Sequence, residues 1–269
     1  MDTVLILVPN YNKEKFLLKT IDSVINQTYA NWKIILLDNN SKDNSVIKVI
    51  KKYNSLIESK QIVIIENKKN IGLVPNWNKG LKYVHNYKYY KILCSDDTIE
   101  KDHLSHGINL LKKTSSKYFA YGSQLNYIND KDQKIGKRRY GFFGLEFWIS
   151  IFYRNYIGCP SSLIFKSEYH NNHKFIRFPY ISDLLFLSNY YLEGKKVIYD
   201  KKYSANFRIS NETETSKFFG SDAMINDKNY LRQYCINNLK INFILKKLLK
   251  IVSMVIHIFE VIFFKILNN

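Results

Sequence analysis

The stretch Lys91-Ile-Leu-Cys-Ser-Asp-Asp97 begins as an apolar run and ends in two adjacent carboxylates. The segment Tyr89–Cys94 has the length and composition of a buried strand, which places Asp96 and Asp97 at its carboxyl end. Open α/β sheets bind their ligands at that edge. Two neighbouring carboxylates repel each other unless a cation or hydrogen-bond donors offset their charge, and Mg²⁺ carrying a diphosphate is one such partner. The alternative is an exposed pair that caps a helix over Ile99–Lys113, and the pair alone leaves both open.

The N-terminal third of the chain alternates predicted strands with predicted helices. Short apolar runs indicate buried strands, and apolar residues at intervals of three and four indicate helices. Successive β-α-β units imply a Rossmann-like α/β fold, in which helices flank a mostly parallel sheet. The predicted strands are Thr3–Val8, Lys33–Leu37, Gln61–Ile65 and Tyr89–Cys94, and the predicted helices are Lys13–Gln27, Asp43–Ile57, Val74–His85 and Ile99–Lys113.

Polar side chains follow three of these strands. The first strand runs into Pro9-Asn10-Tyr11-Asn12, the second into Asp38, and the fourth into Asp96 and Asp97. Because parallel strands end at one edge of a sheet, these groups are expected to converge. Tyr11 can stack on a base, Asp38 can accept a hydrogen bond from a base imide or a ribose hydroxyl, and the two later carboxylates can hold ribose and metal. The sequence therefore predicts a nucleotide-diphosphate site, and the absence of G-x-G-x-x-G and G-x-x-x-x-G-K-[ST] disfavours dinucleotide and P-loop sites.

Composition limits the class of partner and the compartment. The 269 residues carry a formal net charge of +18, which favours nucleic acid, phosphorylated substrates or an anionic membrane surface, unless the lysines are only solvated. No repeating aromatic and basic pattern marks an RNA-binding sheet, so we expect no nucleic acid partner. The three cysteines are far apart and form no Cys-x-x-Cys, and the first apolar stretch ends at Pro9 without a basic segment before it. These features predict a cytoplasmic protein without a signal peptide.

Five segments together resemble the family 2 inverting glycosyltransferases, which have the GT-A fold. They are Val4–Ser45, Asn70–Gly80, Lys91–Asp97, Gly158–Phe165 and Tyr180–Phe186, and the resemblance covers about residues 3–210. It implies that Asp183 is the catalytic base and that Asp96 and Asp97 hold Mg²⁺ or Mn²⁺. The residues implied in nucleotide binding are Pro9, Tyr11, Asp38, Asn70, Asn78, Asp96 and Arg208.

The sequence departs from the family pattern at Cys94, Asn39, Ser182 and Ser210, where the family has Asp, Asp, Glu and His. The chemistry implied is one in-line displacement, in which a carboxylate takes the proton of the acceptor hydroxyl and a cation stabilises the departing diphosphate.

Three segments of this part of the chain have alternative interpretations. Asp183 is either that base or the N-cap of a helix over Leu184–Leu192. Arg208 either contacts phosphate or forms a surface ion pair. The polar, basic stretch Asp130–Arg139 is either a hairpin loop or a flap over the acceptor.

The chain divides into a catalytic domain, residues 1–217, and a C-terminal helical region, residues 218–269. Within Ile251–Phe264 the only polar residues are Ser253, His257 and Glu260, which fall on one narrow stripe of a helix. Lys250 and Lys265 are separated by 14 residues, fewer than the roughly 20 that span a bilayer. Residues 231–269 contain six Lys or Arg and one Glu, a net charge of 6 − 1 = +5. This pattern predicts amphipathic helices that lie on a membrane surface, or else helices that pack on the catalytic domain or a partner subunit.

Two functions remain open from the sequence. The first is transfer of a sugar from a nucleotide-diphosphate sugar, with UDP-sugars favoured, to a hydroxyl of a glycan or lipid-linked acceptor in cell-surface polysaccharide synthesis. It would take place at the cytoplasmic face of the inner membrane. The alternative is a non-catalytic, basic membrane- or nucleotide-binding protein with a decayed GT-A site. The oligomeric state is open.

Overall fold

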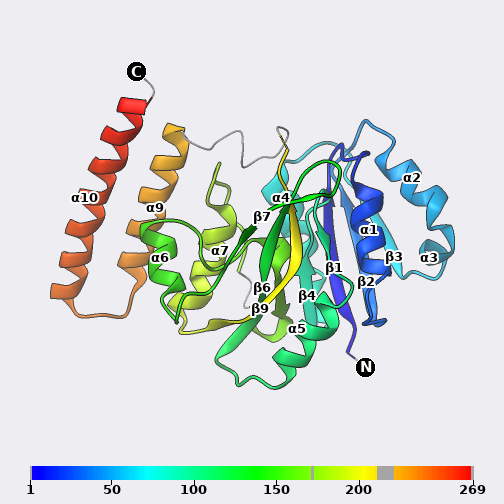
Figure 1. Ribbon diagram of the computed structural model, residues 1–269, viewed down its shortest axis with the longest axis horizontal. Helices are drawn as coiled ribbons and strands as arrows, with labels where there is room; N and C mark the ends of the chain where they lie inside the picture. Colours follow the sequence, from blue (N-terminus) through cyan, green and yellow to red (C-terminus); the bar gives the residue numbers. More distant parts are fainter. Residues whose placement is uncertain (1, 171–172, 211–220, 268–269) are drawn as a thin grey trace.

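The computed structural model describes residues 2–170, 173–210 and 221–267. Its centre is a mixed sheet whose strands follow the order β3-β2-β1-β4-β8-β6-β9-β5, with β7 paired to β6 beside that path. Helices cover both faces of the sheet (Figure 1). This arrangement confirms the predicted α/β fold. The strands are β1 (Val4–Asn10), β2 (Trp32–Asp38), β3 (Ile62–Glu66), β4 (Tyr89–Ile92), β5 (Thr98–Ile99), β6 (Tyr118–Ile128), β7 (Lys134–Arg138), β8 (Leu163–Lys166) and β9 (Lys196–Arg208).

Strands β3, β2, β1 and β4 form the predicted parallel half of the sheet. Their register pairs Asn10 with Asp38 and Asp38 with Glu66, so the carboxyl ends of three strands lie level. The chain leaves β1 and β2 through Asn12 and Asn40, whose φ angles are 51° and 64°. Asparagine tolerates this left-handed conformation better than most residues, which lets both strands end in tight polar turns.

The helices differ from the sequence prediction at two places. A break at Tyr53 divides the helix predicted over Asp43–Ile57 in two. The helix predicted to start at Ile99 begins at His103, because Thr98 and Ile99 pair with β9 as strand β5. The helices are α1 (Leu17–Ile25), α2 (Ser45–Lys52), α3 (Asn54–Glu58), α4 (Leu73–Leu81), α5 (His103–Lys112), α6 (Glu146–Phe152), α7 (Ser182–Leu192), α9 (Asp222–Asn238) and α10 (Phe243–Leu267), with 3-10 turns η1 (Val84–Asn86), η2 (Pro160–Ser162) and η3 (Ser167–Tyr169).

Alternate residues of the central strands feed two hydrophobic cores on opposite faces of the sheet. On β1, Leu5 and Leu7 belong to the core that α4, α6 and α7 cover, whereas Val4, Ile6 and Val8 belong to the core that α1, α2 and α5 cover. Strand residues that are buried on both faces are the signature of a parallel sheet between helical layers. The two cores hold the carboxyl ends of the strands in fixed positions.

The second half of the sheet is mixed. Strand β8 is antiparallel to both β4 and β6, and β9 runs parallel to β6. Strands β6 and β7 form a hairpin whose turn lies within the predicted Asp130–Arg139 loop. This confirms the hairpin and leaves a role over the acceptor untested.

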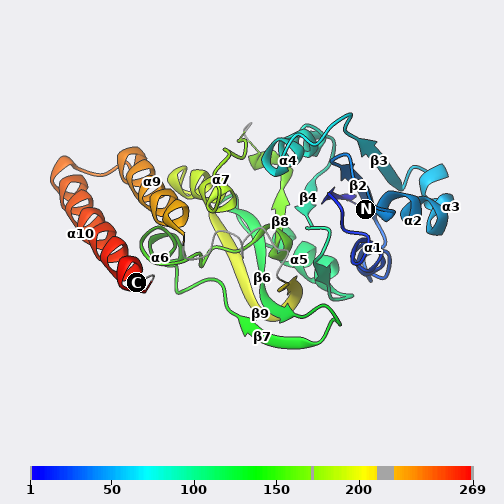
Figure 2. The same ribbon diagram turned by 90° about the horizontal axis from the view of Figure 1, so that it is seen from above.

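Helices α9 and α10 stand side by side at the end of the molecule farthest from α1, α2 and α3, as both views show (Figures 1 and 2). Helix α9 packs against α6 and α7, and α10 packs against α9. The boundary predicted between residues 217 and 218 lies outside the described residues. Of the helices in the described part of the chain, none combines the length and the apolar content that a membrane span requires.

Candidate active site

Asp97 is the most enclosed group at the predicted site, with 1% of its surface exposed. Ser161 Oγ donates a hydrogen bond to Asp97 Oδ2 at 2.5 Å, and the backbone N–H of Arg208 donates to Oδ1 at 2.9 Å. Helix α1 holds the same loop, because Thr20 Oγ1 donates to the main-chain oxygen of Asp97 at 2.8 Å. Burial raises the pKa of the Asp97 carboxyl to about 7. The pair of carboxylates therefore does not cap α5, whose N-cap position is Asp102.

Asp96 is more accessible than its neighbour. Its Oδ2 lies 2.8 Å from Lys13 Nζ, and 16% of its side chain is exposed. In the described ranges, no three His, Cys, Asp or Glu side chains are grouped so that they could hold a metal ion. Mg²⁺ commonly takes only one or two protein carboxylates and completes its shell with substrate phosphates and water. Asp96 and Asp97 thus fit a cation that arrives with a diphosphate, and they do not form a cage of protein ligands.

Arg208 lies beneath these carboxylates at the end of β9, and its guanidinium is fully buried. Its Nε donates to the main-chain oxygen of Asp96 at 2.8 Å, and its charge lies 4.4 Å from the centre of the Phe16 ring. Its two remaining nitrogens donate to the main-chain oxygen of Asn129 and to the carboxylate of Asp132. Arg208 therefore does form an ion pair, with Asp132, although its own guanidinium is buried and not on the surface; a contact with phosphate stays a prediction.

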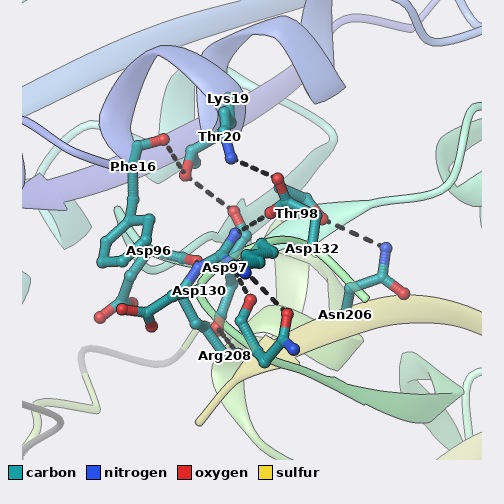
Figure 3. Close-up of polar contacts among 12 residues, drawn as sticks. Phe16, Lys19, Thr20, Asp96, Asp97, Thr98, Asp130, Asp132, Asn206 and Arg208 are labelled. Carbon is teal, nitrogen blue, oxygen red and sulfur yellow. Dashed lines mark hydrogen bonds and ion pairs between the residues drawn. The ribbon is translucent and has the colours of Figure 1, made fainter. Parts of the chain in front are cut away.

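The turn of the β6–β7 hairpin closes over Arg208, as Figure 3 shows. Asp132 pairs with both Arg208 and Lys19, and Asp130 pairs with Lys15. Both lysines belong to the segment that leads into and forms α1. Two carboxylates of the hairpin turn thus neutralise cations that lie next to the Asp96–Asp97 loop.

A second polar cluster lies where β1 and β2 end. Asp38 is 2% exposed. Its Oδ1 accepts from Asn10 Nδ2 at 2.8 Å and from Ser41 Oγ at 2.6 Å, and its Oδ2 accepts from the backbone N–H of Ser41 at 2.9 Å. Pro9 is buried in β1 beside this cluster, and Tyr11 is 43% exposed just beyond it. Asp38 therefore shapes the turn after β2, and Tyr11 offers the exposed aromatic surface predicted to stack on a base.

Asn39 connects this cluster to the loop before α4. Its Nδ2 donates to Asn70 Oδ1 at 2.8 Å, while its Oδ1 accepts from Asn67 Nδ2 and from the backbone N–H of Ile71, both at 3.0 Å. An aspartate at position 39 has no N–H with which to donate to Asn70. The asparagine at this position thus ties the Asn70 loop to the end of β2.

The side chain of Asn78 is hydrogen-bonded to a segment outside the predicted nucleotide site. Its amide makes two hydrogen bonds with the main chain of Phe175, donating to the oxygen at 2.9 Å and accepting from the N–H at 2.8 Å. Phe175 in turn stacks on Phe186 of α7, with ring centres 4.1 Å apart. The predicted nucleotide contact of Asn78 is therefore not what its side chain does in this structure, where it fixes the segment beside α7.

Asp183 lies in the first turn of α7 and is not its N-cap, a position that Ile181 occupies. Its Oδ1 accepts from the backbone N–H of Leu184 at 2.8 Å. Asp183 lines a small cavity together with the apolar residues Ile92, Leu163 and Phe186. Burial raises its pKa to about 6. A carboxyl with a pKa near the working pH is suited to accept a proton during a reaction.

Turn η2 lies within the segment Gly158–Phe165, but its position between the two carboxylate sites was not predicted from the sequence. Turn η2 places Ser161 against Asp97 and Pro160 beside Asp183. Lys91, buried in β4, donates from its Nζ to the main-chain oxygens of Ser161 and Leu163, and burial lowers its pKa to about 7. A lysine within an apolar strand is the sequence signal that could have pointed to this turn, because a buried lysine needs acceptors.

Comparison with known proteins assigns this architecture to a family. The sequence profile described as Glycosyl transferase family 2 matches residues 5–173. This chain belongs to glycosyl transferase family 2. The profile includes the β1 and β2 ends, the Asp96–Asp97 pair and turn η2, whereas Asp183 and Arg208 lie beyond it.

Two of the similar proteins are bacterial glycosyltransferases of named activity. The chain is 33% identical over 135 residues to the Escherichia coli UDP-Glc:alpha-D-GlcNAc-diphosphoundecaprenol beta-1,3-glucosyltransferase WfgD, covering 50% of this chain and 49% of WfgD. It is 36% identical over 121 residues to the Staphylococcus aureus poly(ribitol-phosphate) beta-N-acetylglucosaminyltransferase TarP, covering 43% of this chain and 35% of TarP. The chain thus spans about half, or less, of the length of these relatives.

Solved structures share the fold of this family 2 chain. S. aureus TarS 1–349 in complex with UDP-GlcNAc superposes with a TM-score of 0.69 at 15% identity, over 96% of this chain and 72% of TarS 1–349. The mannosyltransferase PcManGT from Pyrobaculum calidifontis, in complex with GDP-Man and Mn²⁺, superposes with a TM-score of 0.64 at 13% identity, over 93% of this chain and 68% of PcManGT. These similarities establish the predicted GT-A fold.

A prediction concerns the hairpin turn. If Arg208 contacts the phosphates of a donor, Asp132 competes with them for the same charge. Asp132→Asn keeps the shape of the turn and removes that charge, so we expect tighter binding of UDP. Partly exposed ion pairs contribute about 0.2–1 kcal/mol each, so the loss of two predicts a Kd lower by up to about thirtyfold.

Isothermal titration of UDP into the wild type and Asp132→Asn measures this effect. Lys131→Gln, which changes an exposed neighbour in the same turn, is the matched control and should leave the Kd close to that of the wild type. An unchanged or higher Kd for Asp132→Asn would mean that the turn does not compete with the nucleotide.

Proposed function

We propose that this glycosyltransferase moves a sugar from a UDP-sugar to a hydroxyl of a glycan or lipid-linked acceptor, with inversion at the anomeric carbon. The observation that carries the proposal is turn η2, in which Ser161 donates a hydrogen bond to Asp97 and Pro160 lines the same small cavity as Asp183. One short element thus sets a donor-side carboxylate and a proton-accepting carboxylate at neighbouring positions. Direct displacement needs such a pair, because the acceptor hydroxyl must attack while the diphosphate leaves.

The residues have separate roles in this proposal. Tyr11 stacks on the base, while Asp38 and the loop that Asn39 holds to Asn70 line the nucleoside side. Asp96 reaches the ribose, and Arg208 offers charge to the phosphates. Asp183 takes the proton of the acceptor hydroxyl as it attacks, and its apolar surroundings keep water away from that proton transfer. Asp96 and Asp97 would hold a divalent cation, Mg²⁺ or Mn²⁺, which neutralises charge on the diphosphate.

The relatives support the choice of donor and acceptor. The name of WfgD gives a UDP-sugar donor and a diphosphoundecaprenol-linked acceptor, and TarS 1–349 has been solved with UDP-GlcNAc. We propose the same classes for this chain, and we place the reaction at the cytoplasmic face of the inner membrane, where a lipid-linked acceptor can be presented.

Thermal melting with nucleotides tests the donor site. A ligand that binds only the folded state stabilises it by RT ln(1 + [L]/Kd), or about 2.7 kcal/mol at 100 times Kd. We expect UDP to raise the melting temperature, and we expect Mn²⁺ to increase that rise because Asp96 and Asp97 hold metal and diphosphate together. ADP is the matched control for the base and should act more weakly.

Release of UDP from a panel of UDP-sugars, with and without glycan acceptors, then tests for transfer. Stabilisation by UDP without release from any sugar would favour the non-catalytic binding protein considered from the sequence. No stabilisation by any nucleoside diphosphate would remove the nucleotide site from this proposal.

A further inference from the structure

Helix α10 packs on α9 through polar groups. Ser253, which is fully buried, lies 3.1 Å from the amide nitrogen of Gln233. Glu260 pairs with Arg232 at 2.7 Å and with Lys228 at 3.1 Å, and the Arg232 side chain is fully buried. The narrow polar stripe predicted on this helix therefore faces the protein.

The other side of α10 is apolar and exposed. Ile244, Leu248, Ile251, Val255 and Phe259 repeat at intervals of three and four residues, and each is 43–72% exposed. A helix on the surface of a water-soluble domain usually has the opposite arrangement, with its apolar stripe buried and its polar face in water. Large exposed apolar patches of this kind mark interaction surfaces.

Charge on this surface is of one sign. Lys240, Lys247 and Lys250 are exposed at the turn between α9 and α10 and along the first turns of α10. Glu260 is the one acidic residue in the sequence of α10, and it is directed into the seam with α9 by Arg232 and Lys228. The outward surface thus combines apolar side chains with positive charge.

We propose that the outward face of α10 binds the surface of an anionic lipid bilayer, with the helix axis lying in the plane of the interface. Apolar side chains would enter the acyl boundary, while the lysines at the start of α10 would lie among anionic head groups. The 25 residues of α10 give a contact about 37 Å long at about 1.5 Å per residue.

The charge distribution on α10 favours an anionic bilayer over a second copy of the chain as its binding partner. A helix that covers this surface in a dimer would have to bring negative charge to the lysines. The α10 of a second copy carries only Glu260, which is already paired with its own α9. Anionic head groups supply that charge, and acyl chains cover the apolar residues beside it.

Co-sedimentation of the full-length protein with vesicles tests the proposal. The probes are vesicles of phosphatidylglycerol with phosphatidylcholine, and vesicles of phosphatidylcholine alone. Ile244→Gln with Phe259→Gln changes two residues of α10 that are 72% and 68% exposed. Ile47→Gln with Ile50→Gln, on α2 at the other end of the molecule, is the matched control because these residues are 50% and 42% exposed.

We expect the wild type and the α2 control to sediment with anionic vesicles. The α10 variant should bind about tenfold more weakly, because it lacks two apolar side chains that would be buried in the bilayer. Lys247→Gln with Lys250→Gln should weaken binding to anionic vesicles and leave the weaker binding to phosphatidylcholine unchanged. High salt should reduce binding to anionic vesicles without abolishing it, because only the charge contribution is screened.

Three results would overturn the proposal. The first is a wild type that stays in the supernatant with anionic vesicles. The second is an α10 variant that binds as tightly as the wild type, because binding would then rest on general basic charge. The third is an α10 variant whose mass by light scattering, without lipid, falls to a fraction of that of the wild type, because a second copy would then cover α10. Transfer to a soluble acceptor does not depend on α10 in any of these cases, so this test is separate from that of the proposed function.

Discussion

Asp183→Asn is expected to lower turnover by about 10²–10⁴-fold while leaving the affinity for UDP close to that of the wild type. The asparagine keeps an oxygen that can accept from the N–H of Leu184, so the first turn of α7 stays in place. It cannot take a proton from the acceptor hydroxyl. Steady-state transfer kinetics measure the change in turnover, and titration of UDP measures the affinity.

The pH dependence gives a second measure of the same residue. Asp183 must be ionised to act as a base, and burial raises its pKa to about 6. In the wild type, kcat/KM should therefore rise about tenfold per pH unit below about pH 6 and level off above it, and this limb should be absent from Asp183→Asn. Asp222→Asn, an exposed first-turn aspartate of α9, is the matched control and should keep the wild-type profile. A fully active Asp183→Asn, or one that loses UDP affinity instead of turnover, would place the base elsewhere.

Asp97→Asn is expected to lower transfer by orders of magnitude and to abolish the extra stabilisation by UDP that Mn²⁺ provides. The substitution removes the negative charge that would anchor the cation, but the amide oxygen of the asparagine can still accept from the N–H of Arg208, and its amide nitrogen can donate to Ser161 Oγ. The fold should survive. Melting with UDP, with and without Mn²⁺, and transfer assays measure the two effects.

The melting temperature of Asp97→Asn provides a control for its fold. Burial raises the pKa of Asp97 from 3.8 to about 7, so above pH 7 the folded protein holds a buried charge that costs stability. At pH 8, Asp97→Asn should therefore melt at the wild-type temperature or higher. Ser161→Ala, which keeps the charge and removes one hydrogen bond, should retain the response to Mn²⁺. Near-normal transfer by a folded Asp97→Asn would exclude metal anchoring by this residue.

Much of the fold could be predicted because its signals are local and periodic. The four parallel strands are apolar runs with polar ends, and their register brings Asp38 and the Asp96–Asp97 loop to one edge, as expected from sequence. The predicted helix start at Ile99 was wrong, because Ile99 belongs to β5, and a strand of two residues has no periodicity of its own. It exists only because β9, about a hundred residues later, pairs with it.

The parts of the site that could not be predicted depend on contacts between distant segments. No local pattern indicates that Asp132 lies on Arg208, or that Ser161 donates to Asp97, since 76 and 64 residues separate these partners. The helix of residues 243–267 is a different case. Its periodicity defines the polar stripe, but the pattern does not say which side faces the protein. Contacts with Lys228, Arg232 and Gln233 of α9 determine this.

Turn η2 has a consequence for how such an enzyme can diversify. In the proposed function, Ser161 and Pro160 of this turn serve the donor side and the base side together, and Lys91 donates hydrogen bonds to the main-chain oxygens of Ser161 and Leu163. A change in the length of this turn would disturb the binding of both substrates at once. The turn should therefore tolerate few changes that alter the preference for an acceptor. The β6–β7 hairpin and the segment around Phe175 lie outside that shared support. New acceptor preferences are therefore expected to arise through changes in those peripheral segments, while turn η2 and the two carboxylate sites stay unchanged.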